Sequence, residues 1–119
     1  MISILIPIYN FDASDLLKEL FEQSKQFKEQ IEIIVYDDHS KTFTEQNKKT
    51  CDNLNITYLY LKQNLGRGKA INLLAEKAKY KYLLILDCDI FPKSKSFLLN
   101  YVSKIKIETE VLYGGRKHE

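Results

Sequence analysis

The sequence has few of the residues that mark several protein classes, with two cysteines, two prolines and four glycines. Cys51 and Cys88 lie in unrelated contexts, so we expect neither a disulfide framework nor a zinc site. No apolar run approaches the roughly 18 residues that a membrane-spanning helix needs, so no membrane segment is expected in this chain. The first apolar segment starts at Ile2, which leaves no room for a signal peptide, and a cytoplasmic location is expected.

What the sequence does contain is enough apolar material for one packed domain. Its 119 residues are 45% hydrophobic and 29% charged, which excludes a disordered chain. We expect residues 1–119 to form a single domain. The net charge of +2 is too small to indicate a nucleic-acid surface, so no nucleic-acid partner is expected.

Short apolar runs rich in β-branched residues alternate with segments of helical spacing. Strands are predicted at 2–8, 31–36, 56–61, 82–86 and 111–113, and helices at 12–28, 43–54, 67–79 and 96–106. Asp12 or Ser14 is a candidate cap for the first helix. The alternation predicts a three-layer α/β/α sandwich with a mainly parallel, Rossmann-like sheet. Because crossovers between parallel strands are right-handed, a strand order near 3-2-1-4-5 is expected.

Polar residues gather where the predicted strands end. Asn10 follows the first strand, Asp37 and Asp38 end the second, and Asp87 and Asp89 follow the fourth. These positions are the carboxyl ends of strands, which form the edge where open α/β sheets bind ligands. In the expected order the second and fourth strands flank the first, so the polar groups should converge on one crevice.

The triplet Asp87-Cys88-Asp89 is the most informative of these groups. In an extended backbone, residues two apart face the same side, so both carboxylates would meet one ligand and Cys88 would point away. Two carboxylates, with a nucleotide diphosphate supplying further oxygens, suit Mg²⁺ or Mn²⁺. The triplet occurs often by chance, and its place directly after a buried strand is what favours a metal or phosphate role.

The cluster Asp37-Asp38-His39-Ser40 has two interpretations. Asp and Ser are common in turns and helix caps, so the cluster can be purely structural. Alternatively, one carboxylate accepts a hydrogen bond from a base or ribose, as acids do after the second strand of dinucleotide-binding folds. We expect His39 to be exposed in the turn and assign it no catalytic role.

The segment Asn64–Lys69 resembles a phosphate-binding loop only loosely. Its spacing is not that of a Walker sequence, and no third glycine completes a dinucleotide fingerprint. Gly66 and Gly68 nevertheless allow a tight turn with free amides before a helix. Arg67 and Lys69 would either balance a diphosphate there or be solvated.

Four segments together resemble the opening of the family 2 glycosyltransferases, in order and in spacing. They are SILIPIYN (3–10), IIVYDDHS (33–40), NLGRGKAIN (64–72) and LLILDCDIFP (83–92). The resemblance covers roughly the whole chain. It implies a GT-A fold that binds a nucleotide-diphosphate sugar, usually a UDP-sugar, through Mn²⁺ or Mg²⁺.

The resemblance also implies roles for individual residues. The end of the first strand and Asp38 would hold the base, Arg67 or Lys69 would lie near the base or phosphates, and Asp89 would bind the cation. The full assignment is Pro7, Tyr9, Asn10, Asp38, Arg67, Lys69 and Asp87 for the sugar nucleotide, and Asp87 and Asp89 for the metal. The turn carries His39 where the family usually has glycine.

In family members the cation stabilises the leaving diphosphate, and a carboxylate base assists attack by an acceptor hydroxyl. That base and the acceptor pocket come from a later part of the chain than residue 119, so no catalytic residue is assigned. We therefore expect the sugar-nucleotide-binding half of a longer glycosyltransferase, inactive or weakly active alone. The acceptor of the full-length protein would be a saccharide or a lipid-linked molecule.

Two other domain classes that carry acidic pairs fit the sequence less well. A receiver domain needs its acidic pair after the first strand, where this chain has Tyr9-Asn10, and a primase-like domain needs a glutamate there. A non-catalytic nucleotide-binding or assembly module with the same fold remains an open alternative. Because half of the expected enzyme is missing, an edge strand and apolar surface should be exposed, which favours self-association.

Overall fold

Strands and helices alternate along the chain, as the sequence predicts. The structure is a computed structural model that describes residues 2–27, 30–89, 91–92, 94–104 and 111–114. The strands are β1 (Ile2–Ile8), β2 (Ile31–Asp37), β3 (Thr57–Tyr60), β4 (Tyr82–Leu86) and β5 (Val111–Gly114). The helices are α1 (Ser14–Ser24), α2 (Thr44–Leu54), α3 (Arg67–Lys77) and α4 (Phe97–Lys104), with a 3₁₀ turn η1 at Lys25–Phe27.

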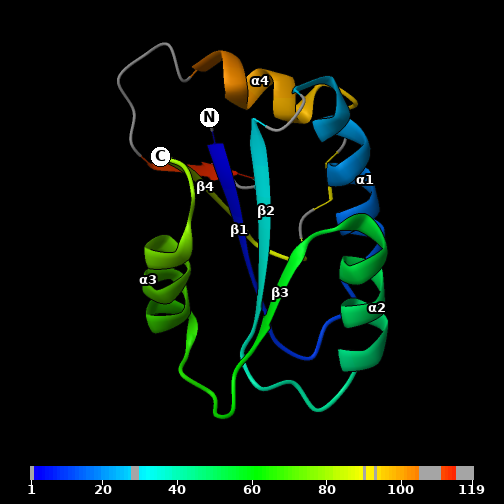
Figure 1. The fold of residues 1–119 in the computed structure, drawn as a ribbon, viewed down its shortest axis with the longest axis vertical. Helices are drawn as coiled ribbons and strands as arrows, with labels where there is room; N and C mark the ends of the chain where they lie inside the picture. The colour runs from blue at the N-terminus through cyan, green and yellow to red at the C-terminus, as the bar shows by residue number, and fades with distance from the viewer. Residues whose placement is uncertain (1, 28–29, 90, 93, 105–110, 115–119) are drawn as a thin grey trace.

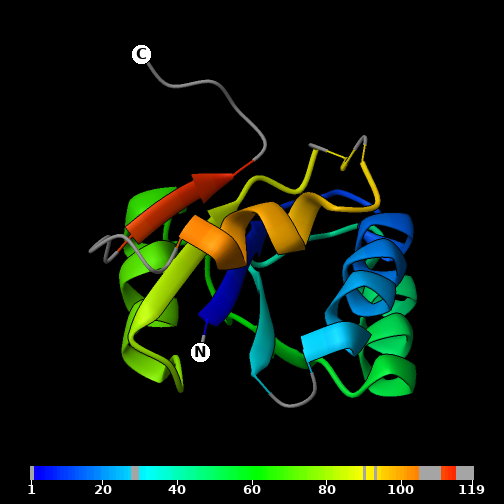
Figure 2. The ribbon, with the colours of Figure 1, turned by 90° about the horizontal axis from the view of Figure 1, so that it is seen from above.

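The described strands form one parallel sheet in the order β3-β2-β1-β4-β5, which confirms the predicted order. Figure 1 shows α3 on one face of the sheet and α1 with α2 on the other. The view from above in Figure 2 shows the same layers from a second direction. The three-layer α/β/α sandwich is therefore confirmed.

Alternating side chains of β1 supply both halves of the core. Ile2, Ile4, Ile6 and Ile8 are buried in a cluster with residues of α1, α2 and α4, whereas Leu5 packs in a second cluster with residues of α3. This alternation is the period of a strand with both faces covered. Each such side chain contributes roughly 1.5–3 kcal/mol on burial, so β1 anchors both helical layers.

The observed element boundaries differ from the predicted ones by a few residues, for local hydrogen-bonding reasons. Helix α1 begins at Ser14 without a side-chain cap, and Asp12 instead accepts the Ser14 amide at 3.0 Å. Helix α3 ends at Lys77, because the chain turns extended at Ala78 and the Lys79 amide donates to the Glu32 carboxylate at 2.7 Å. The predicted end of the last helix, at 106, lies outside the described residues.

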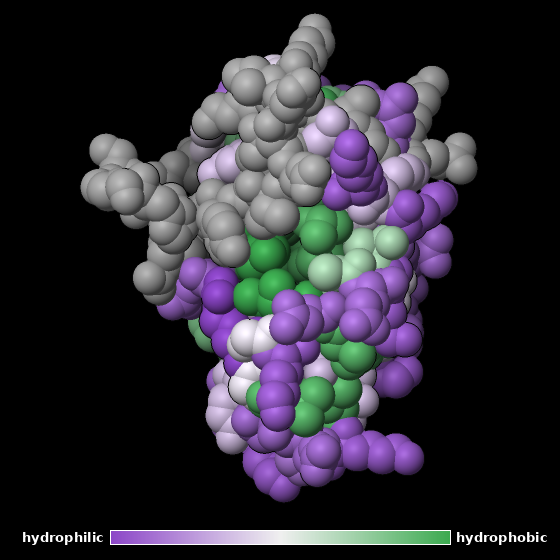
Figure 3. Space-filling view, turned by 90° about the vertical axis from the view of Figure 1, so that its left-hand side faces the viewer, coloured by the Kyte–Doolittle hydropathy of each residue, from purple (hydrophilic) through white to green (hydrophobic). Residues whose placement is uncertain are grey.

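Apolar surface remains exposed on the molecule. Figure 3 shows apolar side chains gathered in the middle of the face on the α3 side, surrounded by hydrophilic ones. The exposed large apolar residues among the described ones include Tyr9, Phe43, Tyr60, Phe91 and Leu99. Self-association stays a prediction. None of the helices among the described residues is long and apolar enough to cross a membrane.

The raised pKa values of the two thiols lead us to predict a loss of stability at alkaline pH. Burial raises the pKa of Cys51 from its ordinary value of 9.0 to about 12, and burial raises that of Cys88 to about 11. Above pH 9 the unfolded chain releases these protons while the folded chain keeps them, so the free energy of unfolding should fall as pH rises toward 12. Urea denaturation on either side of pH 9 measures this fall.

The comparison variant is Cys51→Ala, in which the fall should be shallower. The slope against pH is compared rather than the absolute stability, because removing the sulfur also leaves a small cavity. Equal slopes in the two proteins would contradict the role given to the Cys51 thiol.

Candidate functional site

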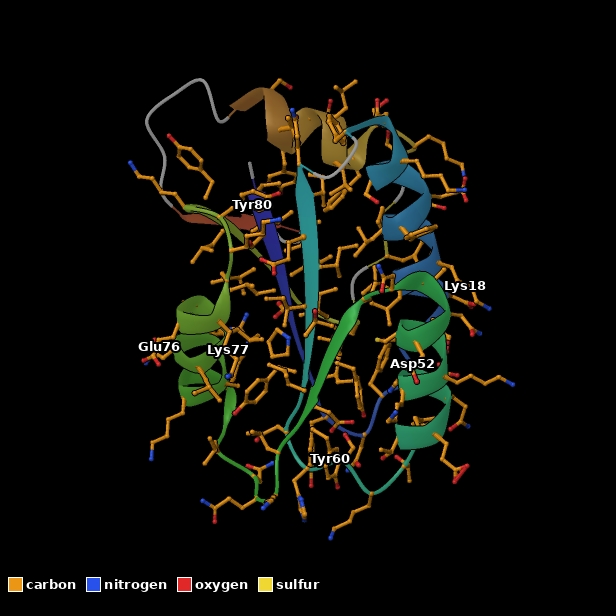
Figure 4. The ribbon with its side chains drawn as sticks, in the orientation of Figure 1. Lys18, Asp52, Tyr60, Glu76, Lys77 and Tyr80 are labelled. Atoms are coloured by element: carbon orange, nitrogen blue, oxygen red, sulfur yellow. The ribbon has the colours of Figure 1, made fainter. Side chains whose placement is uncertain are left out.

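The candidate site lies at the carboxyl edge of the sheet, where the polar strand-end residues meet. In Figure 4, Tyr60 marks this edge and Tyr80 lies toward the opposite one. The register pairs Ile8 with Asp37 and Asp37 with Tyr60, so the ends of β1, β2 and β3 are level. Asp38 directly follows β2 and Asn10 lies two residues after the end of β1, as the sequence predicts.

Asp37 is a structural carboxylate inside the turn. It is fully buried, accepts the Ser40 amide at 2.8 Å and accepts a hydrogen bond from the Tyr58 hydroxyl. Burial, and next the bond to Asp37, raise the pKa of Tyr58 well above its ordinary value. For this acid of the pair, the interpretation as a turn residue is therefore the right one.

Asp38 holds the loop that follows β3. One carboxylate oxygen accepts the Leu65 amide at 2.6 Å and the other accepts the Gly66 amide at 2.8 Å. The Asn64 side chain also donates to the Asp38 carbonyl at 3.1 Å, and Asp38 is only 6% exposed. The expectation of free amides in this loop is therefore wrong for Leu65 and Gly66, because hydrogen bonds to an ionised carboxylate are strong and satisfy them.

Asn10 joins the end of β1 to the turn after β2. It has a φ of 50°, its side-chain oxygen accepts the Lys41 amide at 2.7 Å, and its own amide donates to Ser40 at 2.8 Å. Pro7 lies within β1, half-buried opposite Tyr36. Tyr9, by contrast, is 52% exposed, and Asn10 is exposed as well, so both residues present accessible surface at this strand end.

His39 is not simply exposed, and that expectation is wrong. The residue is half-buried, its Nδ1 lies 3.0 Å from the Leu61 carbonyl, and its ring lies 5.6 Å from that of Tyr60. Its φ of 66° is in the left-handed region that glycine adopts most easily. The turn therefore keeps a glycine-like backbone, with the imidazole bridging β2 to the end of β3.

Helix α3 starts directly after the loop that Asp38 holds. Gly66 has a φ of 85°, which is the conformation that its lack of a side chain permits, and the helix begins at Arg67. Backbone N–H groups in a first helical turn lack intrahelical acceptors and carry partial positive charge. Arg67 and Lys69 are both exposed on this turn. The result is a positive helix end at the sheet edge.

Asp87 is paired with Arg67 across this edge. The guanidinium Nη2 and Nε lie 2.7 Å and 3.2 Å from the same oxygen, Oδ1 of Asp87. Strand β4 ends at Leu86 and the chain continues as a turn, so strand alternation does not set the directions of Asp87 and Asp89 as expected. Asp89 is exposed, and Cys88 is partly buried against the α1-side cluster.

The donor set can be compared with what a divalent cation requires. Within the described part of the chain, no group of three or more His, Cys, Asp and Glu side chains is placed to hold a metal ion. Asp87 and Asp89 offer hard carboxylate oxygens, which suit Mg²⁺ or Mn²⁺ when a diphosphate completes the shell. The residues present therefore fit a shared site and do not fit a cation held by protein alone.

Comparison with known proteins gives this geometry a family. The sequence matches Glycosyl transferase family 2 over residues 3–119, nearly the whole chain. The chain belongs to glycosyl transferase family 2. It is similar to a dolichyl-phosphate beta-glucosyltransferase from Dictyostelium discoideum, 33% identical over 135 residues, covering 98% of this chain and 40% of that protein. Another relative, an uncharacterized glycosyltransferase from Rickettsia bellii, is covered over 17% of its length, so the chain spans less than half of either.

Solved structures share the fold. A mannosyltransferase from Pyrobaculum calidifontis, in complex with GDP-Man and Mn²⁺, matches with a TM-score of 0.80 at 18% identity, over 91% of this chain and 33% of that one. S. aureus TarS 1-349, in complex with UDP-GlcNAc, matches with a TM-score of 0.75 at 28% identity, over 88% and 31%. The expected GT-A-like fold is confirmed.

Asn47 is a supporting residue that the sequence did not reveal. It is fully buried in α2, where its Oδ1 accepts the Ala13 amide at 2.9 Å and its Nδ2 donates to the Phe11 carbonyl at 2.7 Å. These bonds hold the loop that leaves the end of β1. No sequence signal singles it out, because an asparagine on a weakly amphipathic helix is typical of a solvated face.

Replacing Asp38 by alanine should release the loop before α3. Two charge-assisted hydrogen bonds are lost, so we expect Asp38→Ala to lower the free energy of unfolding by about 2–4 kcal/mol in urea denaturation. Hydrogen exchange at the Leu65 and Gly66 amides should accelerate. Asp52→Ala, at an exposed acid on α2, is the control and should stay within about 0.5 kcal/mol of wild type. Unchanged exchange at the two amides would contradict the role of Asp38.

Proposed function

We propose that this chain binds a nucleoside-diphosphate sugar together with Mn²⁺ or Mg²⁺ at the carboxyl edge of β1, β2 and β4. The observation that carries the proposal is the convergence of Asp38, the α3 N-terminus with Arg67, and Asp87 at that one edge. Family membership supports it, as do fold relatives solved with GDP-Man and Mn²⁺ or with UDP-GlcNAc. The chain would be the donor-binding part of a glycosyltransferase that acts on an acceptor hydroxyl.

The diphosphate is proposed to lie between the start of α3 and the turn after β4. Arg67, Lys69 and the first-turn amides of α3 supply positive charge on one side. Asp87 and Asp89 would hold the cation on the other side. When bound, the cation stabilises negative charge on the leaving diphosphate as a Lewis acid. The role of the chain is to orient the donor and its phosphates.

The nucleoside is proposed to lie over the ends of β1 and β2. Tyr9 offers an exposed ring there, beside Pro7 and Asn10. The oxygens of Asp38 already accept loop amides, but each carboxylate oxygen has a second lone pair that can accept a hydrogen bond from a base. Uracil, with an N–H to donate, is the base we propose.

Transfer to an acceptor is proposed for the longer protein rather than for this chain alone. The chain spans 17% and 40% of the two relatives named above, and no residue in it is assigned as the catalytic base. We propose that the binding site for the saccharide or lipid-linked acceptor, and the catalytic base, are formed by residues other than these. Alone, the chain should bind the donor and transfer its sugar poorly or not at all.

Calorimetric titration with UDP, with and without Mn²⁺, is the experiment that tests the proposal. We expect Mn²⁺ to tighten UDP binding, because Asp87 and Asp89 would hold the cation, whose charge would offset that of the diphosphate. Asp89→Asn should remove about tenfold or more of that gain, since it deletes a charged ligand of the cation. Absence of UDP binding at millimolar concentration would contradict the proposed site.

The matched control is Asp52→Asn, which makes the same chemical change on the exposed surface of α2, away from the sheet edge (Figure 4). It should bind UDP and Mn²⁺ as wild type does. If both variants lose the Mn²⁺-dependent gain equally, the effect comes from net charge, and Asp89 is not a ligand.

A further inference from the structure

Arg67 is engaged with one of the two proposed cation ligands. Its Nε and Nη2 donate to a single oxygen of Asp87, at 3.2 Å and 2.7 Å. The Asp87 side chain is 21% exposed, so the pair is partly shielded, whereas the Arg67 side chain is 52% exposed and has room to turn to another partner. The Asp87 carboxylate, which the proposed function assigns to the metal ion, is thus neutralised by a positively charged side chain of the protein itself.

The position of Arg67 is set by the backbone immediately before it. The Gly66 amide donates to Asp38 at 2.8 Å and the Leu65 amide does so at 2.6 Å, so two hydrogen bonds fix the loop to Asp38. Arg67 is the first residue of α3 and follows this fixed point directly. The backbone at Arg67 is therefore fixed at the sheet edge by these two bonds.

This pairing disfavours a bare divalent cation. Mg²⁺ and Mn²⁺ require about six oxygen ligands, and no third side chain among the described residues joins these two carboxylates to hold a metal. A cation that approaches Asp87 must also displace Arg67, whose positive charge repels it. Metal alone should therefore bind weakly.

A diphosphate changes both the number of oxygen ligands that the cation finds and the pairing of Arg67. Its oxygens complete the coordination shell, and its negative charge offers Arg67 a new partner that a guanidinium binds with two parallel hydrogen bonds. Once Arg67 turns to the phosphate, its positive charge no longer opposes a cation at Asp87. Each ligand then favours the binding of the other, which is positive cooperativity with a favourable coupling free energy between the two sites.

We propose that Arg67 makes cation binding depend on nucleotide binding, by pairing with Asp87 until a diphosphate draws its guanidinium away. The inference rests on the proposed function, because it uses the same edge and the same ligands. It adds that Arg67 exchanges one partner, Asp87, for another, the diphosphate. As a result, the cation binds more tightly when nucleotide is present than when it is absent, which neither carboxylate would produce alone.

The first arm of the test uses Mn²⁺ alone, followed by the electron paramagnetic resonance signal of the free ion. Wild type should bind Mn²⁺ weakly. Arg67→Gln should bind it about twofold to fivefold more tightly, the range of an exposed ion pair. The matched control is Lys48→Gln, which removes a positive charge from the exposed Lys48–Asp52 pair on α2 and should leave Mn²⁺ affinity unchanged.

The second arm repeats the titration with UDP present. In wild type, UDP should raise Mn²⁺ affinity by the same factor by which Mn²⁺ raises UDP affinity, as linkage requires. That factor should fall in Arg67→Gln and recover in part in Arg67→Lys, which keeps the charge but not the two-donor geometry. Circular dichroism checks that the exposed substitutions leave the fold intact.

The outcomes separate the two proposals. Unchanged or weaker Mn²⁺ binding by Arg67→Gln, or UDP binding with an unchanged coupling factor, would overturn the role of Arg67 and leave the proposed function standing. Absence of UDP binding to wild type in the presence of Mn²⁺ would overturn the proposed function and the coupling together.

Discussion

The hydrogen bonds from the Leu65 and Gly66 amides to the Asp38 carboxylate are the contact on which the site depends. They join the end of β2 to the loop before α3, across 27 and 28 residues of sequence. The Asn64 side chain adds a bond to the Asp38 carbonyl, and Ala70 and Leu74 pack the helix onto the sheet. Together these contacts place the positive helix end and Arg67 beside Asp87.

Asp37 and Asp38, the adjacent acids at the end of β2, have different roles: one supports the fold and the other the candidate site. Asp37 is sealed in the turn by Ser40 and the Tyr58 hydroxyl, where it supports the backbone. Asp38 faces the loop, where its two carboxylate oxygens accept backbone amides, and it is only 6% exposed. Asp37 is the last residue of β2 and Asp38 is the first residue after it, and the two neighbouring carboxylates reach different partners. The turn that follows is kept in a left-handed conformation at His39, with its imidazole on the Leu61 carbonyl.

The fold could be predicted from the sequence because its signals are local and repeated. The alternating isoleucines of β1 and the apolar run at 82–86 specify buried parallel strands, and the right-handed crossover rule then orders the sheet. The edge that carries the site followed from the same rule. What the sequence could not show is which groups satisfy one another. The Asp38 and Arg67 contacts join residues 20 to 28 positions apart, and no spacing rule covers such pairs. Strand alternation also failed to direct Asp87 and Asp89, because the chain leaves β4 at Leu86 and turns.

The central claim is that the carboxyl edge of β1, β2 and β4 binds a nucleoside diphosphate with a divalent cation. Nuclear magnetic resonance of the ¹⁵N-labelled chain with UDP and Mn²⁺ tests it most directly, because Mn²⁺ broadens the amide signals near it. We expect broadening centred on Asp87–Asp89 and the start of α3, with Tyr80 and the opposite edge of the sheet unaffected. Broadening centred elsewhere, or equal broadening with and without UDP, would contradict it.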